Sequence, residues 1–536
     1  MAVYVPEQFS EEEADILRRY FTNLDGPVFA LVNLPEVVKG ALFARYSRSP
    51  KSLRRLFLDE FVGDLDVSGD ASIDATVGLD RAEELYERVF FDYGDDSVAQ
   101  LGGVHLACEQ ASNLLTKILE WGRLMSYLEQ STRYIAYDSR LGGRYRYYRD
   151  PEILAGPLGT RYVGDLDRIF DTYSHCVEAA TEHVRDTVGR DPADSEFVYR
   201  TATRAKALDA VRGILPAAAT SNVGIYGTGQ AFEALLLRMR SHALPESREY
   251  ADLMLHELRK VIPSFLRRVD LPDRGVEWSD YFSDTRRETR NLVAELFGET
   301  PVDVAPEVEL TDFDPEAEEK ILAAICYPHS SLPDHQLQER VRSLGVDERV
   351  SLMRAYVGER QNRRHKPGRA FERSFYRFDV LSDYGAFRDM QRHRMLTIEW
   401  QKLTPNHGYN RPELVEEAGL GGRFDEAMQR SAALYDVLLD SYPEQASYAV
   451  SMAYRMRYVM QFNAREAIHM LELRSSPQGH PSYRRVALEM HRLIGERAGH
   501  HAIAAAMSHM TTDAPELERL ESERRAEARR DTPRNV

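Results

Sequence analysis

The second half of this chain repeats the first, which limits its possible folds more than any other feature. A helical stretch reaches Arg238 and is followed ten residues later by Arg248; another ends at Arg474 and is followed ten residues later by Arg484. The offset between the two copies is the same for both arginines, since 474 − 238 and 484 − 248 both equal 236. This self-similarity predicts two structural modules that share one fold.

The repeat can also be followed through two earlier segments. Arg392-His-Arg394 lies opposite Trp121-Gly-Arg123 at an offset of 271 (392 − 121), and Tyr409-Asn-Arg-Pro-Glu413 echoes Tyr148-Arg-Asp-Pro-Glu152. Between the Arg392 segment and the later arginine pairs, the offset between the two copies falls by 35 (271 − 236). We therefore expect extra residues in the middle of the first copy and place them in the region 138–200.

The length and the linker-like segments predict the domain boundaries. A single core stops growing at about 250–300 residues, so a chain of this length should hold more than one domain. An acidic stretch punctuated by proline separates the two copies, and the final residues are charged with few apolar anchors, so we expect them to be solvated. We predict an N-terminal extension (1–34), a first domain (35–298), a linker (299–318), a second domain (319–512) and a charged tail (513–536).

Composition excludes several classes of function. The net charge of −17 argues against a nucleic-acid partner, and no window is long and apolar enough to span a membrane. Cys108, Cys176 and Cys326 have no paired spacing, and the scattered histidines, including His500 and His501, lack the context of metal ligands. We therefore expect a cytoplasmic protein without a structural disulfide, a metal ion, a nucleic-acid partner or a membrane partner.

One segment of the first copy carries a dense polar cluster. We predict that residues 81–134 are strongly helical, because apolar residues recur there at three- and four-residue spacing. Glu129, Gln130, Ser131 and Arg133 follow where that pattern breaks. Arginine, serine and free backbone N–H groups near a turn suit a bound phosphate ester. The alternative is an ordinary polar helix terminus.

The same segment resembles the signature region of flavin-dependent thymidylate synthases, the ThyX family. That pattern reads Arg-His-Arg, then Ser, then Asn-Glu-x-Ser-x-Arg-Tyr. The first copy matches it at Ser126 and at Glu129-Gln-Ser-Thr-Arg-Tyr134, with Tyr93-Gly-Asp-Asp-Ser97 upstream. Trp121-Gly-Arg123 stands in the Arg-His-Arg place, and Leu128 replaces the asparagine.

The second copy has kept different parts of the family pattern. It retains Arg392-His-Arg394 and Asn463-x-Arg465 but reads Glu399-Trp-Gln-Lys-Leu-Thr404 where Glu-x-Ser-x-Arg is expected. The first copy has Gly-Thr-Gly-Gln230 in place of the Asn-x-Arg segment. Each copy therefore supplies what the other has lost. Without the resemblance, Arg392–Arg394 would be interpreted as a charged helix face.

The resemblance implies an α+β fold: a helix-rich tandem duplication of the ThyX-type fold, with long helices packed on a small sheet in each copy. It also implies FAD-dependent reductive methylation of dUMP to dTMP, with methylenetetrahydrofolate and NAD(P)H as co-substrates and no protein nucleophile. Family members are homotetramers whose sites are built from several subunits. We therefore expect a homodimer that imitates the tetramer, with composite sites.

The resemblance also implies the roles of individual residues. Arg248 and Arg484 would be catalytic, binding phosphate or polarising the uracil, and Glu246 lies beside the first of them. The substrate-binding set would be Ser126, Glu129, Gln130, Ser131, Arg133, Arg238 and Arg474. The flavin-binding set would be Arg392, His393, Arg394, Asn463 and Arg465. Two alternatives stay open: a ThyX-like flavoenzyme that modifies another pyrimidine nucleotide, and an inactive paralogue that binds nucleotide or flavin.

Overall fold

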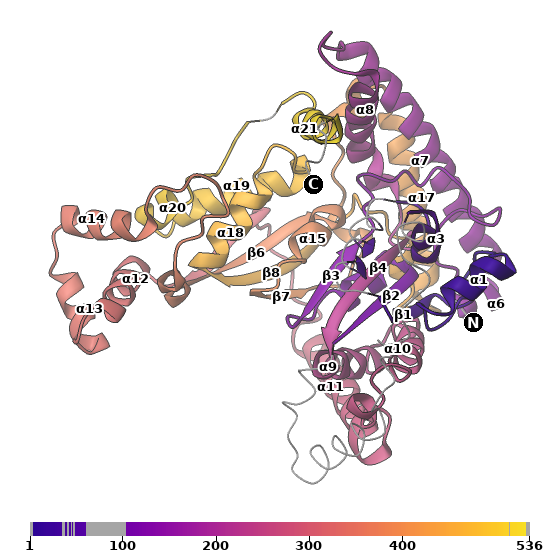
Figure 1. Cartoon of the computed structure of the whole chain (residues 1–536), viewed down its shortest axis with the longest axis horizontal. Coiled ribbons are helices and arrows are strands. Elements are labelled where there is room, and N and C mark those ends of the chain that lie inside the picture. The colour runs from indigo at the N-terminus through magenta and orange to yellow at the C-terminus, as the bar shows by residue number, and fades with distance from the viewer. Residues whose placement is uncertain are drawn as a thin grey trace. The chain divides into compact units, whose positions relative to one another are not determined.

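A computed structural model of the chain describes residues 4–34, 38–39, 42–43, 46, 49–60, 103–513 and 515–531 (Figure 1). The chain forms two compact units, and each combines segments of both sequence halves. Unit 1 comprises Met1–His175, Ile214–Val302 and Gln429–Val450; unit 2 comprises Cys176–Gly213, Asp303–Met428 and Ser451–Val536. The predicted linear domains describe the sequence repeat, whereas the compact units divide the chain differently. Tyr93–Ser97 lies outside the described residues.

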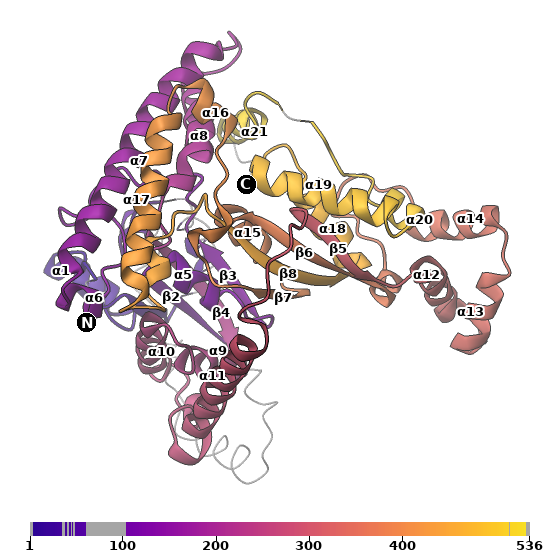
Figure 2. The same ribbon diagram turned by 180° about the vertical axis from the view of Figure 1, so that it is seen from behind.

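Unit 1 contains an antiparallel four-stranded sheet in the order β1-β2-β4-β3. The strands are β1 (Val28–Leu31), β2 (Gly103–Ser112), β3 (Met125–Glu129) and β4 (Thr220–Thr228). The helices are α1 (Glu11–Leu17), α3 (Leu53–Glu60), α5 (Asn113–Leu119), α6 (Pro151–Ala155), α9 (Gly229–Arg240), α10 (Pro245–Leu258) and α11 (Glu277–Phe297), with parts of α7 (Gly159–Thr187) and α17 (Gly421–Leu439). Figure 2 shows the ribbon of Figure 1 from behind.

Unit 2 contains a second antiparallel sheet in the order β5-β6-β8-β7. The strands are β5 (Val308–Phe313), β6 (Phe375–Asp383), β7 (Leu396–Trp400) and β8 (Arg455–Asn463). The helices are α8 (Glu196–Val211), α12 (Ala317–Cys326), α13 (Asp334–Arg342), α14 (Val346–Val357), α15 (Tyr384–Met390), α16 (Glu413–Glu417), α18 (Ala464–Arg474), α19 (Pro481–Glu496), α20 (His501–Ala506) and α21 (Leu520–Asp531), with the remaining parts of α7 and α17.

The two sheets have the same register, which confirms the α+β tandem duplication. Met125 of β3 pairs with Gly227 of β4, and Leu396 of β7 pairs with Phe462 of β8. The offset between the copies is 271 from β3 to β7 (396 − 125) and 235 from β4 to β8 (462 − 227). In β2 one additional residue forms a bulge beside Gln110, whose φ is 56°.

The structure corrects the repeat alignment by one residue through one pair of helices. Thr228 caps α9 and Asn463 caps α18, which gives an offset of 235 (463 − 228). Arg474 is therefore equivalent to Met239 and not to Arg238. Arg248 and Arg484 keep their offset of 236, because the connection from α18 to α19 is longer than that from α9 to α10.

A second alignment shifts in the same way. The backbone N–H of Tyr148 bonds to the carbonyl of Ala218, and that of Asn410 bonds to the carbonyl of Ala453. Tyr409 is therefore equivalent to Tyr147 rather than Tyr148. Part of the extra length of the first copy is α8, which reaches Val211 and so extends beyond the predicted region 138–200.

The helix predicted over residues 81–134 is wrong for most of its described part. Residues 103–112 form β2 and residues 125–129 form β3; only 113–119 are helical. β2 is buried along most of its length, so it lacks the alternation by which a half-exposed strand is recognised. Pairing with β4 determines the strand conformation of both segments.

Two segments predicted to be irregular or solvated are partly ordered. Val308–Phe313, inside the stretch 299–318, forms β5 because Val308 and Leu310 bury against the sheet. Near the C-terminus, Leu517 and Arg519 are buried, and Arg519 donates two 2.9 Å hydrogen bonds to Asp209. The described helices include none with the length and apolar character needed to cross a membrane.

Candidate functional site

In unit 2, His393 of the Arg-His-Arg segment contacts two residues of α18. This imidazole lies between α15 and β7 and is buried. Its Nδ1 lies 3.1 Å from Oε1 of Glu466, on the first turn of α18, and Arg474 at the end of that helix donates from Nε to His393 Nε2 at 3.0 Å. Because arginine can only donate, Nε2 accepts and Nδ1 carries the proton. The Arg-His-Arg segment is thereby joined to α18.

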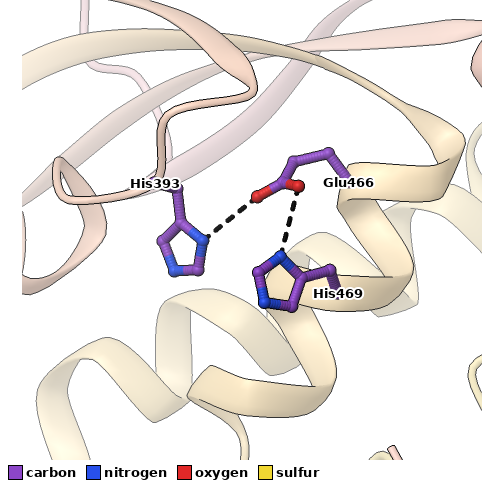
Figure 3. A group of neighbouring side chains, drawn as sticks. All are labelled: His393, Glu466 and His469. Atoms are coloured by element: carbon purple, nitrogen blue, oxygen red, sulfur yellow. Dashed lines mark hydrogen bonds and ion pairs between the residues drawn. The ribbon is translucent and has the colours of Figure 1, made fainter. Parts of the chain in front are cut away.

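Glu466 holds a second histidine in the same way. Its Oε2 lies 3.2 Å from Nδ1 of His469, one helical turn further along α18 (Figure 3). Burial lowers the pKa of His393 to about 4, and Arg474 acts in the same direction. Burial acts to raise the pKa of Glu466, but hydrogen bonds from His393 and His469 outweigh it and lower that pKa to about 2. The cluster therefore contains a carboxylate between two imidazole N–H groups.

The spacing of this cluster would also suit a metal ion, since the three ligand atoms lie within 4.8 Å of one another. Two features oppose that interpretation. The hydrogen bond from Arg474 occupies the lone pair of His393 Nε2 and puts the proton on Nδ1, the nitrogen that faces Glu466, so neither ring nitrogen is available to an ion in this arrangement. The guanidinium would also repel a cation. We therefore interpret the cluster as a hydrogen-bonded chain, and the expected absence of a metal stays a prediction.

Three guanidinium groups converge on Asp389, a buried residue of α15. Arg212 approaches its Oδ2 at 3.3 Å, Arg474 approaches its Oδ1 at 3.7 Å, and Arg392 also pairs with Oδ1. The roles of Arg212, Asp389, Glu466 and His469 are not predicted from the sequence. The three-residue spacing of Glu466 and His469 could have indicated from the sequence that these two side chains meet on one helix. No such local signal exists for Arg212 and Asp389, which are 177 residues apart.

The other predicted flavin residues lie around the start of α18. Asn463 caps this helix, and its Oδ1 accepts from the N–H of Glu466 at 2.8 Å. Arg465 donates to the carbonyl of Pro367 at 3.0 Å and lies 3.5 Å from Glu372. Arg394 is exposed. The structure thus joins His393 directly to α18, whereas Arg465 has separate partners.

The predicted substrate residues of unit 1 are divided between the interior and the surface. Glu129 is buried and lies 3.1 Å from Lys117, which also pairs with Glu120 at 2.5 Å. Gln130 is buried and donates to the carbonyl of Ser49 at 2.6 Å. The other members of this set are less buried. Ser126 is exposed, and Arg133 is half-buried; the backbone N–H of Arg133 donates to the Ser131 hydroxyl at 3.2 Å.

The predicted arginines of the later helices have mainly local contacts. Arg238 lies 5.1 Å above the ring of Trp121, and burial lowers its pKa. Arg248 is exposed and donates to the carbonyls of His242 and Ala243 at 2.7 and 2.8 Å. Arg484 is buried and donates to the carbonyl of Ser475 at 3.0 Å and to that of Asp513. The catalytic roles of Arg248 and Arg484 stay predictions.

Unit 2 contains a cavity of about 650 Å³ where unit 1 places bulkier side chains. Gly213, Asn410 and Ser482 contribute to the lining of this cavity. In unit 1 the residues equivalent to these three are Tyr448, Tyr148 and Glu246. Those side chains contact one another: the tyrosine rings lie 5.2 Å apart, and the Tyr448 hydroxyl donates to Glu246 at 2.7 Å. Smaller residues therefore leave space in unit 2.

Comparison with known proteins agrees with this duplicated architecture. The thymidylate synthase complementing protein family matches residues 47–264 and again residues 309–498. A UPF0159 protein of Chlamydia muridarum is 37% identical over 526 residues, covering 97% of this chain and 99% of that protein. A UPF0159 protein of Chlamydia pneumoniae is 38% identical over 487 residues, covering 90% of this chain and 91% of that protein. A UPF0159 protein of Thermoplasma acidophilum is 32% identical over 514 residues, covering 90% of this chain and 97% of that protein. The chain therefore belongs to the thymidylate synthase complementing protein (ThyX) family and carries the family segment twice.

Proposed function

We propose that this protein is an FAD-dependent thymidylate synthase that converts dUMP to dTMP with methylenetetrahydrofolate and NAD(P)H. Family membership supports a thymidylate synthase-like flavoprotein. One observation carries the proposal further: His393 of the Arg-His-Arg segment contacts both Glu466 and Arg474 on the helix that Asn463 caps. The motif at 392–394 is thus joined through Glu466 and Arg474 to the helix whose N-terminal end carries the motif at 463–465.

The donor groups of unit 2 fit a flavin dinucleotide. Arg394 and Arg465 are cationic groups suited to an anionic diphosphate. Burial lowers the pKa of the Lys366 ammonium, and the charge of Glu466 acts in the opposite direction. Asn463 and His469 supply polar atoms on the same helix. When bound, FAD would supply the hydride that completes the methyl group. The residues of this chain would bind and orient the cofactor and the nucleotide.

A second candidate function is an inactive paralogue or an enzyme acting on another pyrimidine nucleotide. The burial of Glu129 favours it, because that carboxylate is engaged by Lys117 inside unit 1. Gln130 is likewise directed to the backbone of Ser49. A nucleotide site that used these residues would need other groups, or a rearrangement of the segment that carries them.

The quaternary structure is part of the proposal. Two family segments per chain make a homodimer the smallest assembly with four copies of the fold, as in the family tetramer. Light scattering on the protein as it elutes from a size-exclusion column should give a molar mass about twice the chain mass of 61.4 kDa. A monomer at working concentration would contradict the dimer, and the composite sites stay a prediction.

The direct test uses purified full-length protein. A flavoprotein should be yellow and release FAD on denaturation. A thymidylate synthase should also release tritium from labelled dUMP in the presence of methylenetetrahydrofolate and NADPH. Flavin without tritium release would favour another nucleotide substrate. A colourless protein that FAD cannot reconstitute would remove both enzyme hypotheses.

A further inference from the structure

Helix α11 of unit 1 carries a concentration of exposed apolar side chains. Ser279 is the one buried residue among the 21 residues of this helix. The large apolar residues that α11 exposes, each by 40% to 61%, are Trp278, Tyr281, Phe282, Leu292, Val293, Leu296 and Phe297. Together they expose about 700 Å², which is more than the largest apolar patch of a typical monomer. An apolar surface of this size marks an interaction site.

The apolar residues follow the spacing of a helix that packs on another helix. Positions 278, 282, 285, 289, 292 and 296 are separated by alternating steps of four and three residues, which is the seam of a coiled coil. Threonine occupies the two central positions of this seam, and large apolar residues occupy the other four. A shallow surface hollow is lined by Phe282, Thr285, Arg286, Thr289, Arg290 and Val293. The seam therefore fits a second helix.

Contacts on another side of α11 attach the helix to unit 1. Arg286 donates to the carbonyl of Ser241, just after α9, at 2.9 Å, and Arg290 pairs with Glu444 at 2.8 Å. Accordingly, α11 lies beside α9 in both views of the ribbon (Figures 1 and 2). Ser279, Arg286 and Arg290 share one side of the helix, which leaves most of the seam exposed.

Helix α11 is an addition to the shared fold. The two family matches, at 47–264 and 309–498, do not include it. In unit 2 the equivalent of α10 is α19, which is followed among the described residues by the six-residue α20 and not by a helix of this length. The packing of the duplicated fold therefore does not explain α11, and its seam needs another partner.

Area and charge favour a second copy of this chain as that partner. Two identical seams would together bury about 1,400 Å², which is within the range of stable protein interfaces. Identical surfaces meet across a two-fold axis, the commonest symmetry of protein dimers. A membrane surface fits less well, because anionic lipids attract a basic polar face, whereas α11 carries five acidic and three basic residues.

We propose that the seam of α11 is a dimerisation surface, on which the same seam of a second copy packs to form an intermolecular pair of helices. Since α11 lies outside both family matches, this contact is additional to those between the family segments. The inference rests on the homodimer of the proposed quaternary structure and not on the flavin chemistry. An inactive paralogue would dimerise in the same way.

The test is the dissociation constant of the full-length dimer, measured by analytical ultracentrifugation. Leu292→Glu combined with Leu296→Glu places charge in the seam and should raise this constant about 100-fold or more. Asn291→Glu combined with Ala294→Glu is the matched control, because it adds the same charge at exposed positions of the same turns but outside the seam. The control should dimerise as the wild type does. Circular dichroism of each protein verifies that it is folded.

The outcomes separate this surface from the proposed function. A monomeric wild type overturns the surface, and so does a seam variant that dimerises as tightly as the wild type, although the homodimer itself then stands. Equal losses in the seam variant and the control would also overturn it. Should the glutamate variant not fold, Leu292→Ala combined with Leu296→Ala decides: about tenfold weaker dimerisation supports the surface, and unchanged dimerisation overturns it.

Flavin content measured on the same preparations tests the function independently. A wild type that dimerises through the seam but neither contains nor takes up FAD would keep the surface and lose the proposed function. A yellow wild type whose dimer ignores the seam substitutions would do the reverse.

Discussion

The hydroxyl of Ser112 donates a 2.5 Å hydrogen bond to the buried carboxylate of Glu246, joining the end of β2 to α10. At the equivalent positions of unit 2 the two groups are exchanged: the hydroxyl of Ser482 on α19 donates to the carboxylate of Asp383 at the end of β6. The duplication has kept one acid and one hydroxyl in each unit but on opposite elements. The interaction is retained, whereas the residue types at each position are not.

Glu246 should make stability depend on pH. Burial raises its pKa from 4.5 to about 7, so the folded protein holds a proton that the unfolded chain releases. The resulting stability is fully present below pH 4.5 and is lost as pH rises through 7. Glu246→Gln should therefore be nearly neutral at pH 5 and stabilise by about 3 kcal/mol at pH 8.

Thermal denaturation of Glu246→Gln and the wild type at both pH values measures this difference. Asp252→Asn, on the exposed side of the same helix, is the control and should show no such dependence. Equal effects of Glu246→Gln at pH 5 and pH 8 would contradict the raised pKa.

His393 should act with the opposite sign. Burial lowers its pKa from 6.5 to about 4, so the unfolded chain takes up a proton that the folded protein excludes. This stability is present above pH 6.5 and is lost as pH falls toward 4, by up to about 3 kcal/mol. The change in the urea midpoint between pH 7.5 and pH 5 should differ from that of the wild type in His393→Gln but not in the exposed control His335→Gln. An unchanged pH difference in His393→Gln would rule out this role.

Lys117 should be necessary for the stability of unit 1, because its ammonium neutralises buried carboxylates. It is the buried cation between Glu120 and Glu129, and Lys117→Met would leave two carboxylates without it. Loss of one partner of a buried pair costs about 3–5 kcal/mol, and the melting temperature should fall accordingly. Lys51→Met, which breaks an exposed pair with Asp59, should cost less than about 1 kcal/mol. Similar losses in the two variants would mean that Lys117 is not the neutralising group.

Flavin and nucleotide binding should be separable by mutation. Arg133→Ala should weaken dUMP binding about tenfold and leave flavin content unchanged, because Arg133 belongs to the nucleotide half of the family motif. Arg394→Ala should lower flavin content and leave dUMP binding nearly unchanged. Arg492→Ala, on an exposed face of α19, should change neither quantity. Parallel losses in both assays from either variant would contradict the division.

Much of the duplication could be predicted from the sequence, because residues such as Arg484 and Arg248 recur at a fixed offset. Its finer alignment could not. The Leu-Arg pairs at Arg238 and Arg474 match in residue type, but helix caps at Thr228 and Asn463 define the spatial equivalence. A one-residue shift turns each side chain by about 100° on a helix, so this difference changes which residues face the site.

Other features depend on contacts that no local pattern reveals. The sequence predicts a helix in place of β2, because a strand buried for most of its length loses the two-residue period. The approach of Arg212 to Asp389 depends on the placement of α8 in unit 2. Motif matching identified His393 and Asn463, but Glu466, which contacts both, belongs to neither motif.

A duplicated and partly altered ThyX chain should still assemble a working flavin site. The decisive measurement is flavin analysis combined with tritium release on one preparation of the full-length protein. We expect bound FAD and release of tritium from labelled dUMP that depends on methylenetetrahydrofolate and NADPH. A folded protein that neither contains nor takes up FAD would contradict the proposed function.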